Sequence, residues 1–151
     1  MRDKRFVAEH RGGLLRKEQH YQLINWACAC AEHVLHLFCE GMDDRLRDAL
    51  HVAKDWKQGK ASVGDARKAS LNAIAVANES SNPTSIAVAR SVGHAVATAH
   101  MADHSLGAAL YALKAAKNVG ISLDEEREWQ NAQLPLDIRD LVISARRARN
   151  I

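Results

Sequence analysis

Three histidines in one short stretch are the residues of this sequence best suited to chemistry: His94, His100 and His104. On one continuous helix His100 and His104 would share a face, and this i,i+4 spacing holds zinc in some metalloenzymes. His94 would lie about 240° from His100 around the helix axis and point elsewhere. One hypothesis is therefore a metal-dependent helical-bundle enzyme that uses this histidine cluster. The alternative is that these histidines form hydrogen bonds across packed helices.

The remaining reactive side chains form no catalytic pattern. The sequence holds no G-x-S-x-G nucleophile turn, no glycine-rich phosphate loop and no H-E-x-x-H motif. Cys28 and Cys30 are two positions apart on an expected helix, so they point in nearly opposite directions and cannot bind one ion together. We expect these thiols, and that of Cys39, to be buried and inert. The sequence predicts a non-catalytic protein without a cofactor.

Two acidic pairs stand where helices are expected to begin, Asp43-Asp44 and Glu125-Glu126. Negative charge at a helix N-terminus is stabilised by the helix dipole, which is a sufficient structural reason for their position. The sharper hypothesis is that these carboxylates face a protein partner, together with Trp129, which sits among charged residues. Asp43, Asp44, Glu125, Glu126 and Trp129 are therefore our candidate partner-binding residues.

The elements that must position these residues are all helices. Apolar residues recur at three- and four-residue steps, capping residues precede several of the runs, and no strand pattern competes. We predict a single compact all-α bundle of about six to seven helices with short connections, in which residues 1–16 form an N-terminal arm and residues 17–151 the helical domain. The expected helices cover about 17–40, 44–58, 62–79, 82–101 and 103–118, a short segment from 122 and a last one from 135.

Alanine dominates the middle of the chain, between residues 61 and 117. Small side chains allow helix axes to approach closely, so we expect tight helix packing there. The capping patterns are clearest around this region. Ser62 with Asp65 forms a variant capping box, Asn82 precedes a proline suited to a first helical turn, and Ser122 with Glu125 forms a full box.

Composition and charge limit the classes of partner and the cellular location that we expect. The chain has 151 residues and a formal net charge of +3, which is too small an excess to indicate a nucleic-acid binder. We expect the basic tail of Arg146, Arg147 and Arg149 to be a solvated helix end. No window approaches the length of an apolar membrane span. An odd number of cysteines and no apparent secretory signal favour a reducing, cytoplasmic location.

The order and spacing of several motifs resemble one known family. The residues that carry the resemblance are Trp26-Ala27, Cys30-Ala31-Glu32, Val34-Leu35, Phe38, Asp44-Arg45, Arg47, Ala49, Ala53, Trp56, Gly59, Ser62 to Ala69, Gly93 to His100, His104, Gly107 to Ala109 and Tyr111-Ala112. Over about residues 20–117 the chain resembles the Imm-5-like family of immunity proteins from bacterial polymorphic toxin systems. The resemblance implies an all-helical protein that neutralises a cognate toxin by binding it, and it leaves a homo-oligomer open.

Overall fold

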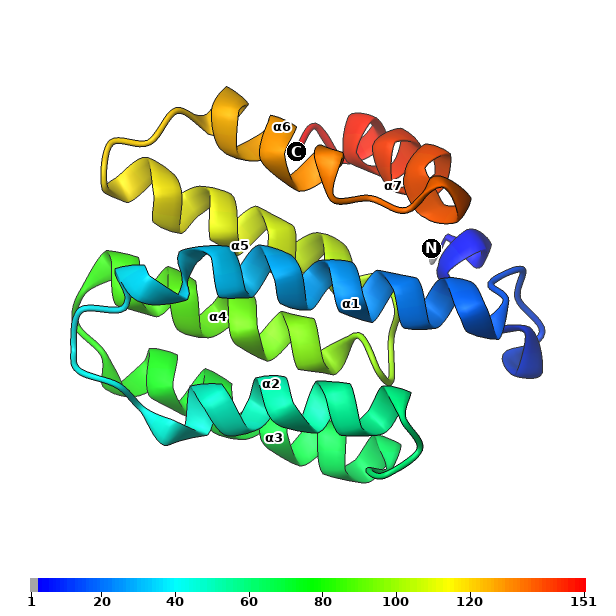
Figure 1. The fold of residues 1–151 in the computed structure, drawn as a ribbon, viewed down its shortest axis with the longest axis horizontal. Helices are drawn as coiled ribbons and strands as arrows, with labels where there is room; N and C mark the ends of the chain where they lie inside the picture. Colours follow the sequence, from blue (N-terminus) through cyan, green and yellow to red (C-terminus); the bar gives the residue numbers. More distant parts are fainter. Residues whose placement is uncertain (1–2) are drawn as a thin grey trace.

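The computed structural model describes residues 3–151, and within them the chain forms seven α-helices (Figure 1). This confirms the predicted all-α bundle with short connections. Three 3₁₀ turns are also present, at Lys4–Phe6, Glu9–Arg11 and Leu35–Leu37. The helices are α1 (Lys17–Val34), α2 (Asp44–Lys57), α3 (Val63–Glu79), α4 (Pro83–Ala97), α5 (His104–Asn118), α6 (Leu123–Ala132) and α7 (Leu136–Arg149).

Capping side chains begin the helices where the sequence places them. The Ser62 hydroxyl accepts from the Asp65 backbone N–H at 3.0 Å, and the Asp65 carboxylate accepts from the Ser62 N–H at 2.9 Å. At α4 the Asn82 side chain accepts from the backbone N–H of Ser85 at 3.0 Å. Each bond satisfies a backbone N–H that has no partner inside its helix.

Helix α4 ends earlier than the sequence suggests, at Ala97 instead of near Met101. In a longer helix the Thr98 carbonyl would accept from the N–H of residue 102. Here the Nε2 of His20 lies 2.6 Å from that carbonyl oxygen and takes its place. The Thr98 hydroxyl donates back to the His94 carbonyl at 3.0 Å. The chain then turns through residues 98–103 and reverses into α5.

Helix α4 lies at the centre of the bundle and contacts α1, α2, α3 and α5 (Figure 1). Its sides are lined with small residues that are fully buried, among them Ala89 and Ala95. The same holds for Ala73 of α3 and Ala108 of α5. Small side chains at these contacts bring the helix backbones close together, as the alanine-rich composition predicted.

The outer layer, α6 and α7, is joined to the bundle by buried hydrogen bonds in addition to apolar contacts of α7. Gln130 is fully buried; its amide donates to the Ala109 carbonyl at 3.0 Å and its side-chain oxygen accepts from Arg146 at 2.7 Å. The Trp26 indole N–H donates to the Gln130 carbonyl at 2.7 Å. Arg146 is only 3% exposed, so the expectation that it belongs to a solvated tail is wrong.

Residues 3–16 pack against one end of the bundle. Phe6 and Leu15 are almost completely buried, in a cluster that also contains residues of α1, α5 and α7. Backbone bonds close the segment on itself, from the Leu15 N–H to the Val7 carbonyl and from the Glu9 N–H to the Leu15 carbonyl, both at 2.9 Å. This end of the molecule is thereby covered by a short, irregular piece of chain.

Candidate functional site

The predicted histidine cluster forms, but with a different geometry. The Nδ1 atoms of His94 and His104 lie 3.0 Å apart, and the rings of His100 and His104 are 5.4 Å apart between centroids. The expectation that His94 points away from the others is wrong. It assumed a continuous helix, whereas the reversal after Ala97 places the start of α5 beside the end of α4.

These rings occupy space that the fold leaves for them. A Cβ atom added at Gly107 would lie 2.6 Å from the Nδ1 of His94, so a glycine is needed there for the imidazole to fit. The Tyr111 ring stacks on the His94 ring, with 5.2 Å between the ring centroids. Burial, and after it the charges of His104 and Arg90, lower the pKa of His94 to about 4. His94 is therefore neutral at pH 7 and packs as an uncharged ring.

The hypothesis of a metal site on His94, His100 and His104 finds no matching arrangement. Across residues 3–151, no group of three or more histidine, cysteine, aspartate or glutamate side chains is placed to hold a metal ion. The close contact between His94 and His104 is a hydrogen bond between two imidazoles, in which one nitrogen donates and the other accepts.

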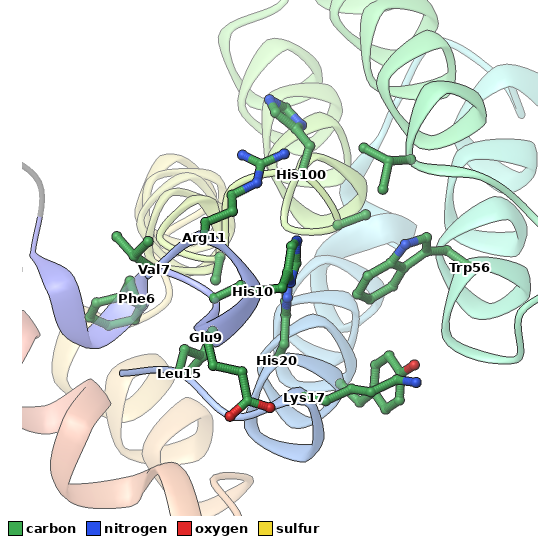
Figure 2. Close-up of a pocket in the computed structure, with 15 residues that line it drawn as sticks. Phe6, Val7, Glu9, His10, Arg11, Leu15, Lys17, His20, Trp56 and His100 are labelled. Carbon is green, nitrogen blue, oxygen red and sulfur yellow. The ribbon is translucent and has the colours of Figure 1, made fainter. Parts of the chain in front are cut away.

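A pocket of about 340 Å³ lies elsewhere, between the N-terminal segment and the bundle (Figure 2). It is bordered by residues 6–11, the first turn of α1, the end of α2, the start of α3 and the turn after α4. Three of its lining residues are histidines: His10, His20 and His100. Sequence reasoning selected only His100, and for a different cluster.

His20 forms the inner part of this pocket. Its Nε2 donates to the Thr98 carbonyl at 2.6 Å, which leaves Nδ1 as the acceptor nitrogen of the neutral ring. Burial lowers its pKa, and the charges of His10 and Arg11 lower it further. The ring lies 4.9 Å from that of Trp56. One sequence signal could have identified His20, because it continues the buried stripe of Leu23 and Ala27 one turn upstream.

The rim of the pocket is basic. Arg11 and Lys17 line it, and Figure 2 shows Arg11 extending toward His100 while the Glu9 carboxylate points away from both. Burial, then the charges of His104, Arg67 and Arg11, lower the pKa of His100. The Nδ1 atom of His100 is buried and has no hydrogen-bond partner within the described part of the chain. The pocket thus combines an aromatic wall with several nitrogen donors.

The candidate partner-binding residues divide between two edges of the molecule, because α2 and α6 lie on opposite sides of α1, α4 and α5 (Figure 1). Asp43 caps α2 by accepting from the Arg45 N–H at 3.0 Å, and its carboxylate also pairs with the Arg45 guanidinium, which lowers the pKa of Asp43. Asp44 and Glu125 are exposed. Their partner-binding role stays a prediction.

Glu126 is used inside the molecule. It is 4% exposed, and its carboxylate lies 2.6 Å from the Nδ1 of His33. The half-buried Trp129 stacks on the same imidazole, with ring centroids 3.5 Å apart and planes 6° from parallel. Of the two α6 carboxylates proposed as contacts, only Glu125 is presented at the surface.

The three cysteines have two kinds of surroundings. Cys28 and Cys30 are buried as expected, and burial raises the pKa of the Cys28 thiol to about 12 and that of Cys30 in the same direction. Cys39 is exposed, so the expectation that it is buried is wrong. Its Sγ lies 3.2 Å from the Ser85 hydroxyl.

None of the described helices is both long and apolar enough to cross a lipid bilayer.

Comparison with known proteins gives a family match. A family model described as "Imm-5 like putative immunity protein" matches residues 13–137, which include α1 to α6 and the start of α7. The match is wider than the resemblance seen in the motifs, which spanned about residues 20–117. Neither a curated protein nor a solved structure gave a match. Because the family model covers most of the chain, this protein belongs to the Imm-5-like family of immunity proteins.

Proposed function

We propose that this protein is an immunity protein that neutralises a cognate toxin by binding it, without chemistry of its own, in the bacterial cytoplasm. The observation that carries the proposal is the family match over residues 13–137. The fold is compatible with it, because a compact helical bundle offers rigid surfaces that need little reordering when a partner binds.

The outer face of α6 is the contact surface that we favour. Asp124, Glu125 and Glu128 are exposed on this helix, and Trp129 is half-buried beside them. The side chain of Asp124 is 90% exposed. Aromatic residues next to charged groups are common among the residues that dominate interface energies. A basic patch on the toxin would complement this face.

The buried side of α6 supports this choice. Gln130 and Glu126 hold the helix against α5 and α1 through hydrogen bonds of 3.0 and 2.6 Å. The exposed carboxylates therefore project from a fixed helix, and little conformational freedom is lost on binding. The net charge of +3 repels a basic partner at long range, so the attraction has to be local to this face.

Growth rescue tests the proposal. A candidate toxin, sought among the genes that neighbour the gene for this chain, is expressed in a sensitive host with and without the chain, and we expect the chain to restore growth. Continued killing despite good expression would contradict the immunity function. Charge reversal on α6, Glu125→Lys with Glu128→Lys, is expected to weaken rescue and to lower toxin affinity in calorimetry. Asp44→Lys tests the opposite edge, and Lys68→Glu on α3 is an exposed control.

A further inference from the structure

The pocket under the N-terminal segment has the features of a ligand site that toxin binding does not require. Its inner wall is aromatic and firmly held. The Trp56 ring lies 4.9 Å from His20 and 5.4 Å from Tyr21, which meets it edge-on. Phe6 and Leu15, both 1% exposed, also line the pocket. A flat apolar group can lie against these side chains.

Two cations of the pocket lining, Arg11 across from Trp56 and Lys17 beside Tyr21, have no acidic partner in the described part of the chain. Arg11 forms no ion pair or hydrogen bond through its side chain within residues 3–151. Lys17 lies over the Tyr21 ring at 5.7 Å and has no acidic partner in the same range. Glu9 is the one acidic side chain of the lining, and Figure 2 shows its carboxylate turned outward. An anion in the pocket would face cations that are otherwise unpaired.

Arg11 and His100 lie together on one side of the pocket. The Nδ1 of His100 has no hydrogen-bond partner among the described residues, and because it has almost no exposed surface it can bond to a ligand only after the imidazole ring turns. Arg11 extends toward the same histidine in Figure 2. A guanidinium binds a planar carboxylate through two parallel hydrogen bonds, which fixes the orientation of the acid as well as its position.

The volume limits the size of the ligand. About 340 Å³ is at the lower end of the range for small-molecule pockets, which runs from roughly 300 to 1,000 Å³. We propose that this pocket binds a small aromatic carboxylic acid, with its ring against Trp56 and its carboxylate between Arg11 and His100. The pocket is separate from the α6 face, so the ligand proposal and the toxin-binding proposal are tested independently of each other.

Calorimetry on the full chain tests this with defined probes. Indole-3-acetate and phenylacetate are titrated beside the neutral indole-3-acetamide, which has the same shape without the charge. We expect saturable binding of at least one acid and binding of the amide that is about tenfold weaker or more, since a charged hydrogen bond is lost. Arg11→Gln should weaken binding of the acid by a similar factor. Trp56→Leu should weaken binding of both the acid and the amide.

Lys4→Gln is the matched control, because Lys4 is an exposed cation of the same segment that does not line the pocket. It should leave binding unchanged. The proposal is overturned if neither acid binds, if the amide binds as tightly as the acid, or if Arg11→Gln has no effect while thermal unfolding shows the variant to be folded. A peptide ending in tryptophan is the last probe. Binding of this peptide without binding of the free acids would assign the pocket to a partner's chain end and overturn the small-molecule proposal.

Discussion

The two sides of this bundle are joined to its centre by different means. Between α3, α4 and α5 the contacts are made by alanines that leave no space, such as Ala89, Ala95 and Ala108. Between the centre and the α6–α7 layer, apolar side chains such as Ile138 and Val142 also pack, and buried donors and acceptors around Gln130 are added to them. The first kind depends on shape, so it fails when a side chain becomes larger. The second depends on matched hydrogen bonds, so it fails when one partner is removed.

This difference bears on the proposed function. The buried hydrogen bonds around Gln130, which we call the polar joint, hold α6 in place. The exposed acids and Trp129 lie on this helix. Directional hydrogen bonds, added to the apolar contacts, fix the position and the rotation of α6 relative to the bundle. The polar joint therefore fixes the orientation of the surface that we propose for the toxin.

The largest expected effect comes from breaking the polar joint. Gln130→Leu removes the acceptor of the buried Arg146 and leaves that guanidinium without its shortest bond. We expect a loss of about 3 kcal/mol in the free energy of unfolding, measured in urea.

A second substitution distinguishes a lost bond from a poor fit. In Gln130→Leu with Arg146→Met both polar partners are replaced by apolar groups, and most of the loss should be recovered. If the double variant loses as much stability as Gln130→Leu and Arg146→Met lose together when measured separately, the contact does not depend on the pairing of these two residues.

Enlarging one of the buried alanines between α3, α4 and α5 should lower the free energy of unfolding by a smaller amount. No second substitution of a bonding partner is expected to restore it. Ala95 is fully buried on α4, and Ala95→Leu inserts extra carbons where there is no room. The free energy of unfolding should fall by about 2 kcal/mol in the same urea assay. Ala148→Leu, at an exposed position of α7, is the control and should change it little. Equal effects at both positions would contradict the close packing.

Acid should weaken the contact between α4 and α5 that contains His94. In the unfolded chain this imidazole takes up its proton at an ordinary pKa near 6.5, whereas in the folded chain it does so only at about 4. The unfolded state therefore binds more protons between these values, and stability falls as the pH drops from 6.5 toward 4. Because the ring is partly exposed, we expect a loss of about 1 to 2 kcal/mol from His94.

Urea unfolding at pH 7.5 and pH 5 measures this loss. His94→Gln should reduce the pH dependence, since glutamine does not titrate. His20 and His100, whose pKa values are lowered in the same direction, contribute the dependence that is left. An unchanged pH dependence in His94→Gln would show that His94 titrates normally in the folded protein.

The smallest effect is expected on the outer face of α6. Asp124→Ala breaks an ion pair with Arg127 whose oxygen and nitrogen are 3.0 Å apart, but the aspartate side chain is 90% exposed. Unfolding should change by less than about 0.5 kcal/mol. A change in toxin affinity without a change in stability would place this carboxylate in the interface. A large loss of stability would instead show a structural role.

Several helix starts were predictable because their signals are local, whereas α1 ends at Val34, short of the expected residue 40. Ser62 with Asp65 and Asn82 with Pro83 lie within a few residues of the bonds that they make, so the starts of α3 and α4 agree with expectation. The end of α4 was not predictable. It depends on His20, a residue 78 positions away from the carbonyl that it binds.

The sites were harder to predict than the helices for the same reason. His94 and His104 meet because the chain reverses between them, and helical spacing cannot describe a reversal. Arg146 resembled part of an exposed tail because its partner, Gln130, lies on another helix. The pocket depends on residues 6–11; an N-terminal arm was expected there, but these residues have no periodic pattern, so the cavity that they close was not predictable.

The position of that covering segment has an evolutionary consequence. The family model begins at residue 13, so His20, Trp56 and His100 lie inside the matched region while His10 and Arg11 lie outside it. Most of the inner wall, together with Lys17, therefore lies in the matched region, whereas Arg11 lies on a short piece of chain outside it that adds little to the core beyond Phe6. Selection can exchange Arg11 without disturbing the helices. What the pocket accepts can then change while the fold stays the same.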